Sequence, residues 1–226
     1  MIYLKKFETD TEKDTWQKSP DHVFPNTIFV HSTTNVEYNI PSLRGVFIQH
    51  TDGTLYRTDE WRAKGFANDA ANGIAVVDHR ASFVIAKEAL GGNATWSSDM
   101  INKIEGVTST FKEEDARADY RGYENTLEIA KTDTKGCAYL CVNYSFPNGV
   151  AGYMPAAGEW DIVLENWDAI NSAMTIVGAS VLQTGMYYWT STQYNNSSAW
   201  IARDFKITPN LKNYGWWVRP FTKLES

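Results

Sequence analysis

The chain of 226 residues is long enough for one large domain, or for a domain with a small appendage. Its apolar fraction of 43% and charged fraction of 21% are ordinary for globular proteins and exclude a mainly disordered chain. The formal net charge of −6 provides no basic excess for phosphate contacts, so we predict no nucleic-acid partner.

The first residues, MIYLKKFETD, carry two lysines without a following apolar segment, so we expect no secretory signal peptide. No run approaches 18 apolar residues, and no membrane span is expected. A role outside the cell would then require release by lysis, by a dedicated machine or within a particle.

Residues 1–44 differ from the remainder of the chain, because they hold three of its seven prolines. Short strands are predicted at residues 27–30 and 36–40. We interpret residues 1–44 as a β-rich attachment or oligomerisation segment, and residues 45–226 as the main domain. An equal alternative is that the first segment wraps the main domain.

The main domain begins with a predicted hairpin, in which residues 45–50 and 54–57 flank the turn dipeptide Asp52-Gly53. Two further strands are predicted at residues 74–77 and 82–86. A short helix is predicted over residues 98–104, with Ser98 as its N-cap.

Two longer helices are predicted next. One runs from Asn125 to Tyr144 and is interrupted by Gly136, whereas the other starts at Gly158 and ends at Gly178. In the second helix, apolar residues recur at steps of three and four, which indicates one broad buried face.

Three strands are predicted in the tail, at residues 187–191, 199–205 and 216–221, separated by polar loops at 193–198 and 208–215. Strands, then helices, then strands indicate an α+β fold in which helices pack against an antiparallel sheet.

Motifs for catalysis or metal binding are missing. The four histidines show no metal-ligand spacing, and neither a phosphate loop nor a nucleophile elbow is present. Cys137 and Cys141, four residues apart on a predicted helix, are interpreted as core residues rather than as a reactive pair.

The tail has an unusual composition. Residues 187–221 contain ten aromatic residues, where the chain average predicts about five, and only five charged side chains. Rings combined with Asn, Ser and Thr are typical of adaptable binding surfaces. The alternative is that the rings fill the core. Neighbours in Tyr187-Tyr188-Trp189 and in Trp216-Trp217 must point to opposite faces of a strand, so one core cannot bury them all.

Several motifs resemble one family. They are GYMPAAGEW at residues 152–160, YWTSTQ at 188–193, AW at 199–200 and VRPF at 218–221. Together they resemble the C-type lectin-like fold of the formylglycine-generating-enzyme type. More narrowly, they are similar to variable proteins of diversity-generating retroelements, including phage receptor-binding proteins such as the major tropism determinant. The segment at 119–126 and the helix around residues 137–144 fit the version common in Bacteroides and their phages. The resemblance covers residues 45–221.

The resemblance implies a binding protein with diversified, solvent-facing residues near the C-terminus. It implies that Trp189, Arg219 and Pro220 belong to the scaffold. The implied ligand-contacting residues are Gln193, Tyr194, Asn195, Asn196, Ser198, Trp200, Asn210, Lys212, Asn213, Tyr214, Trp216 and Trp217.

Two departures limit what the resemblance implies. The enzyme of this fold needs reactive cysteines in its C-terminal half, and no cysteine follows Cys141, so we predict no oxidase activity. The calcium-binding sugar loop of true C-type lectins is also missing. No metal, cofactor or calcium-dependent sugar binding is therefore implied.

The sequence thus favours a non-enzymatic recognition module. It would bind a protein or glycan receptor on a bacterial surface and attach to a phage tail or related particle through residues 1–44, with trimers or other homo-oligomers raising avidity. One alternative is a small glycan hydrolase that uses Glu159 or Asp204. Another is a structural particle protein whose aromatic tail packs against a neighbouring subunit.

Overall fold

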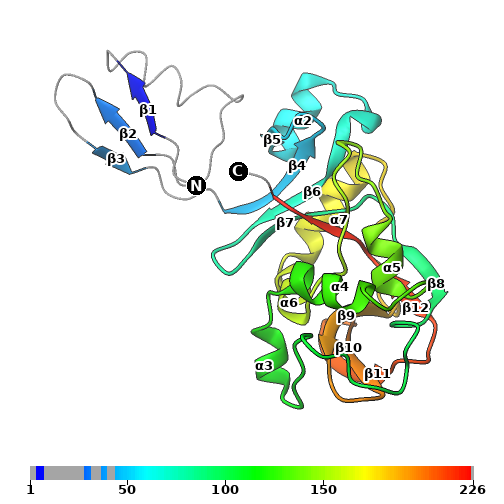
Figure 1. Ribbon diagram of the computed structural model, residues 1–226. Coiled ribbons are helices and arrows are strands. Elements are labelled where there is room, and N and C mark those ends of the chain that lie inside the picture. The colour runs from blue at the N-terminus through cyan, green and yellow to red at the C-terminus, as the bar shows by residue number, and fades with distance from the viewer. Residues whose placement is uncertain (1–3, 8–27, 32–36, 40–43, 225–226) are drawn as a thin grey trace.

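The computed structural model describes residues 4–7, 28–31, 37–39 and 44–224, and side-chain surroundings from residue 44 onward. Within these residues the chain forms six α-helices and three β-sheets, which confirms the predicted α+β class (Figure 1).

The first sheet holds only strands from the opening segment. β1 (Leu4–Phe7) pairs in parallel with β2 (Ile28–His31), which pairs antiparallel with β3 (Glu37–Asn39). The two predicted strands correspond to β2 and β3, whereas β1 was not predicted. An attachment role for residues 1–44 stays a prediction, and the rest of that segment lies outside the described residues.

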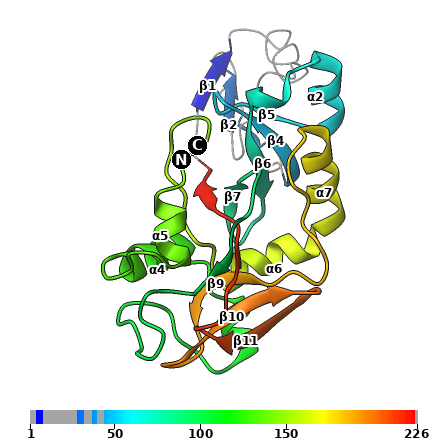
Figure 2. The same ribbon diagram turned by 90° about the vertical axis from the view of Figure 1, so that its right-hand side faces the viewer.

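The second sheet is antiparallel, in the order β13-β7-β6-β4-β5. Its strands are β4 (Gly45–His50), β5 (Leu55–Tyr56), β6 (Ala71–Val77), β7 (Ser82–Ile85) and β13 (Phe221–Lys223). Gly53 has a φ of 91°, so the predicted hairpin turn uses the freedom of glycine as expected. β13, near the end of the domain, pairs antiparallel with β7 and so completes a sheet made of the domain's first strands (Figure 2).

The third sheet has the order β11-β10-β9-β12-β8, and the tail supplies four of its five strands. They are β8 (Leu90–Ala94), β9 (Tyr188–Gln193), β10 (Ser198–Arg203), β11 (Lys206–Leu211) and β12 (Trp216–Val218). The predicted loop at 208–215 is therefore partly wrong, because β11 extends into it. β11 is an edge strand, where Pro209 costs little because one side of the strand makes no sheet pairing.

Both predicted long helices are divided. The first is α4 (Gly122–Ala130) and α5 (Cys137–Val142), and the second is α6 (Ala157–Glu165) and α7 (Trp167–Ile176). Gly178, at a φ of 66°, ends α7 as predicted. Two short helices, α2 (Thr58–Lys64) and α3 (Glu113–Arg117), and the 3₁₀ turn η1 (Asn68–Ala70) were not predicted.

The helix predicted at residues 98–104 is wrong. Its expected cap, the Ser98 hydroxyl, donates to Asp133 Oδ1 instead, at 2.6 Å. Asp99 Oδ1 accepts from the backbone N–H groups of Ile101 and Asn102, which gives a local turn. The segment is consequently an irregular loop between β8 and α3.

Cys137 and Cys141 are free and fully buried in a cluster with Trp96, Trp189 and Ile201, which confirms that they are core residues. Burial raises the pKa of both thiols well above the usual value, so they are inert at neutral pH.

Candidate binding surface

The third sheet has two faces, which its register distinguishes. Tyr188, Trp200 and Ala202 lie on the face that packs against α6, which we call the α6 face. Trp189, Ala199 and Ile201 alternate with them and join the cluster beneath α4 and α5. We call this second side the stack face.

Three aromatic rings stack on one another at the stack face. Tyr187 and Trp216 have ring centroids 4.2 Å apart and an interplanar angle of 13°, and Tyr214 stacks on Trp216 at 5.6 Å. The guanidinium of Arg203 lies over the Tyr187 ring at 4.1 Å. We call Arg203, Tyr187, Trp216 and Tyr214 the ring stack. Its rings come from the residue before β9, from β12 and from the segment before β12.

The ring stack is not sealed. Tyr214 is 48% exposed, and Tyr187, Trp216 and Arg203 are half-buried. The indole Nε1 of Trp216 is buried without a hydrogen-bond partner. Arg203 caps one end and its charge is balanced by Asp204, whose Oδ2 lies 2.8 Å from Arg203 Nε. Tyr214 at the other end is the most exposed ring of the stack.

Polar side chains share the stack face. The pairs Ala199↔Asn210 and Ile201↔Thr208 place Asn210 and Thr208 on the side of Ile201. Both are half-buried, and Asn213 beside Tyr214 is exposed. These groups give the rings a surround that can hydrogen-bond.

The two Asn-bearing segments of the tail lie side by side. Asn195 Oδ1 accepts from the N–H groups of Ser197 and Ser198 and so shapes the turn between β9 and β10. Lys212 N donates to Ser197 O, which joins the second segment to this turn. Asn196 is exposed at the turn, and Tyr194 contacts the exposed Phe111 edge-on at 5.1 Å.

Four of the predicted ligand-contacting residues are buried in the structure, so they are not part of an open surface. Gln193 is fully buried and bonds Ile104 N and O, while Trp200 is 3% exposed and donates from Nε1 to Thr110 O. Ser198 is buried within β10. The fourth buried residue of the predicted set is Lys212.

Lys212 is fully buried, and its Nζ donates to Asn102 O and to Gln193 Oε1. It lies 4.3 Å from the centroid of the Trp96 ring. Burial lowers the pKa of the Lys212 ammonium to about 8. The buried Lys212 side chain therefore connects the loop between β8 and α3 to the tail through these hydrogen bonds.

The other eight predicted residues fall into three groups. Asn210, Asn213, Tyr214 and Trp216 are on or beside the stack face, and Tyr194, Asn195 and Asn196 form the β9–β10 turn. Trp217 is separate, because it pairs with Tyr188 and packs against the cluster of the α6 face. Trp189, Arg219 and Pro220, expected to be scaffold, are buried.

Tyr187, Arg203 and Thr208 belong to the surface but were not predicted as ligand-contacting residues. A signal for Tyr187 was present, since strand alternation requires neighbouring rings to take opposite sides. Phe111 and Ile101, which are 68% and 74% exposed on the loop between β8 and α3, carried no signal in the sequence.

The hydrolase alternative required two carboxyl groups across a cleft. Glu159 is instead 4% exposed, and its carboxylate accepts from Tyr153 Oη and Ala156 N. Burial raises the pKa of Glu159 to about 8. Asp204 is paired with Arg203.

No group of three or more potential metal ligands occurs among residues that the structure describes. Within the same residues, no helix has the length and apolar character needed to cross a membrane.

Comparison with known proteins finds a similar fold. No family model matches the chain, and no curated protein matches it. A crystal structure of a fimbrial protein from Bacteroides ovatus ATCC 8483 is similar with a TM-score of 0.58 and 14% sequence identity. The match covers 87% of this chain and 50% of that protein, so the chain spans half the length of its neighbour.

Proposed function

We propose that residues 45–226 form a non-enzymatic recognition module that binds a receptor on a bacterial surface through the stack face. The observation that carries this proposal is the ring stack, in which three rings remain partly open to solvent on a sheet whose opposite face packs against α6. A few aromatic anchors on a stiff support supply most of the affinity of such a surface, at about 2 kcal/mol or more each.

The exposed groups around the rings support binding rather than further packing of the core. Asn213 is exposed, Asn210 and Thr208 are half-buried, and the charge of Arg203 is balanced by Asp204. A neutral surface of rings and small polar groups suits a neutral or weakly charged partner. Weak single sites would gain avidity if the chain forms homo-oligomers such as trimers.

The similar fold of a fimbrial protein supports an extracellular setting, in which the module is part of a surface appendage. The finer proposal is a C-type lectin-like variable protein of a diversity-generating retroelement, carried by a phage tail or a related particle. It rests on the tail motifs named above. A near-copy of the coding sequence for residues 187–221 beside a reverse-transcriptase gene, differing mainly at adenines, would support it, and a genome without such a copy would contradict it.

The recognition proposal is tested by binding the immobilised chain to bacterial surface extracts. Tyr214→Ala and Trp216→Ala should each weaken binding about tenfold or more. Tyr139→Ala is the matched control, because Tyr139 is a similarly exposed tyrosine on α5, and it should leave binding unchanged. If the parent and both stack variants bound equally well, the stack face would be rejected as the receptor-binding surface.

The same extracts identify the class of receptor. Protease treatment abolishes binding to a protein receptor, and periodate treatment abolishes binding to a glycan. If the tail rings instead pack against a neighbouring subunit, the stack variants would change the oligomeric state while no extract binds.

A further inference from the structure

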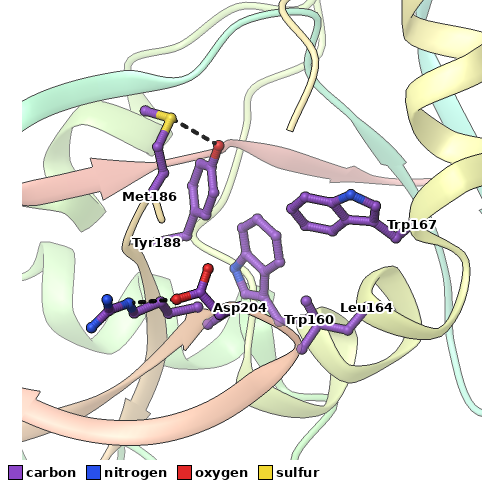
Figure 3. A pocket seen from close by; sticks show the side chains of 8 residues that line it. Trp160, Leu164, Trp167, Met186, Tyr188 and Asp204 are labelled. Atoms are coloured by element: carbon purple, nitrogen blue, oxygen red, sulfur yellow. Dashed lines mark hydrogen bonds and ion pairs between the residues drawn. The ribbon is translucent and has the colours of Figure 1, made fainter. Parts of the chain in front are cut away.

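The two ends of the ring stack are held in different ways. At one end Arg203 lies over Tyr187 and is paired with Asp204, and Figure 3 draws this ion pair as the dashed line at Asp204. At the other end is Tyr214, which belongs to the short segment 212–215 between β11 and β12. The position of the open end therefore depends on what holds this segment.

Lys212 fixes the start of the segment through its backbone. Its N–H donates to Ser197 O at 2.9 Å, in the turn between β9 and β10, and its carbonyl accepts from Trp96 N at 3.1 Å. Trp96 is fully buried and lies just after β8 in the sequence. One residue thus joins the tail to two other parts of the third sheet.

The end of the segment is fixed by a close approach of two backbones. A Cβ atom on Gly215 would lie 2.7 Å from Asn93 Cα in β8, so only glycine fits against this strand without a shift. Tyr214 N donates to Leu211 O at 3.1 Å, which closes a turn. Tyr214 is thus held between two fixed residues, although it is itself 48% exposed.

The Lys212 side chain fastens a second loop to the same place. Its Nζ donates to Asn102 O at 3.0 Å and to Gln193 Oε1 at 2.9 Å. Gln193 Oε1 also accepts from Ile104 N, and Gln193 Nε2 donates to Ile104 O. The loop between β8 and α3 is therefore bound on both sides of Lys103.

A buried ammonium is a costly way to join these segments. Lys212 is fully buried, and both of its acceptors are neutral carbonyl oxygens, with a cation–π contact to Trp96 at 4.3 Å. Replacement of such a group by an apolar side chain of similar size is often neutral or stabilising. The ammonium therefore adds little to stability at neutral pH. Buried polar groups of this kind can instead specify one arrangement of the chain.

We propose that Lys212 is a positioning residue of the stack face. Its ammonium holds the loop between β8 and α3 against segment 212–215 and so fixes Tyr214 at the open end of the ring stack. This inference rests on the proposed function, in which the receptor meets Tyr214 in one arrangement. A binding group that is already in place raises affinity, because less ordering is needed on binding.

The variant Lys212→Met separates positioning from stability. Methionine keeps an unbranched apolar stem, Gln193 Oε1 keeps its bond from Ile104 N, and Asn102 is exposed, so its carbonyl can bind water. In urea unfolding at neutral pH, the midpoint of Lys212→Met should equal or exceed that of the parent. The matched control is Lys206→Met, which removes an exposed lysine of β11.

Two readouts on the free chain follow the arrangement itself. Trypsin should cleave after the exposed Lys103 about tenfold faster or more in Lys212→Met, because the loop loses one of its two fastenings. In ¹H–¹⁵N spectra, the indole signal of Trp216 should shift or broaden, because the Tyr214 ring that stacks on it loses its fixed place. Lys206→Met should leave both readouts as in the parent.

Binding to the surface extract is the third readout, and Lys212→Met should weaken it about tenfold. A lower midpoint with faster cleavage at Lys103 and at the exposed Lys64 of α2 alike would make Lys212 a structural residue and overturn the inference. Unchanged cleavage at Lys103 with an unchanged Trp216 signal would also overturn it. If no extract binds even the parent, the proposed function fails, whereas the free-chain readouts still decide whether Lys212 positions Tyr214.

Discussion

The two faces of the third sheet carry the same kinds of side chain and use them differently. On the α6 face, Tyr188 and Trp200 are buried against α6 and against the loop between β8 and α3. On the stack face, Trp189 is equally buried, but Tyr187, Trp216 and Tyr214 extend beyond the covered area. Aromatic content therefore does not mark a binding surface by itself. What matters is which part of a face a neighbouring element covers.

The largest expected effect separates the buried rings from the open ones. Trp189→Ala should lower the free energy of unfolding by about 3–5 kcal/mol, because it leaves a large cavity and removes the bond from Nε1 to Ala94 O. Tyr214→Ala should lower it by less than about 1 kcal/mol. Urea unfolding of both variants measures the difference, and equal losses would mean that Tyr214 is a structural residue.

The effect on binding should not follow the effect on stability, because Tyr214 is open to solvent and adds little to the fold. Tyr214→Ala should cost about 2 kcal/mol of binding free energy, which is roughly thirtyfold in affinity for the surface receptor. Tyr139→Ala, on α5, should cost nothing measurable. Titration of the immobilised variants with the active extract provides the comparison, and loss of binding in both would point to a general defect.

Lys212 makes the stability of the tail depend on pH. In the folded chain its pKa is about 8, whereas the unfolded value is 10.5, so between these limits only the unfolded state carries the proton. The Lys212 contribution to stability therefore rises with pH across this window, by at most about 1.4 kcal/mol per pH unit. Any stability advantage of Lys212→Met over the parent should shrink from pH 8 to pH 10. A constant difference in urea unfolding would show that the ammonium is not buried.

The smallest effect concerns the two-residue turn Asp204-Phe205 between β10 and β11, where Phe205 has a φ of 63°. Phe205→Gly and Phe205→Ala both remove the ring and its contact with Trp167, but only glycine relieves the positive φ. The glycine variant should be more stable than the alanine variant by about 1 kcal/mol. Thermal unfolding of the two variants checks this, and equal stability would show that the positive φ of residue 205 costs no stability.

Much of the fold could be predicted because local signals agree with it. Asp52-Gly53 indicates its hairpin, Gly178 ends its helix, and alternation in residues 187–189 separates the faces. The misses have physical causes. β11 contains a proline that only an edge position tolerates, and the helix predicted from Ser98 fails because Asp133, 35 residues away, binds that side chain.

The binding surface was harder to predict than the fold. The sequence predicts Gln193 in a loop and Trp200 on a strand, both open to a ligand. In the structure, Gln193 bonds to Ile104 and Trp200 bonds to Thr110, each about 90 residues away in the sequence. Such long-range covering leaves no local pattern. Tyr187 and Arg203 join the surface for the same kind of reason, since their stacking depends on how β9, β10 and β12 pair.

Hydroxyl-radical footprinting of the chain, free and bound to the active surface extract, tests the central claim most directly. The stack face predicts strong protection of Tyr187, Tyr214 and Trp216 on binding, with Tyr139 on α5 and Leu127 on α4 reacting as before. Unchanged labelling of the three rings, together with protection at α4 or α5, would contradict it.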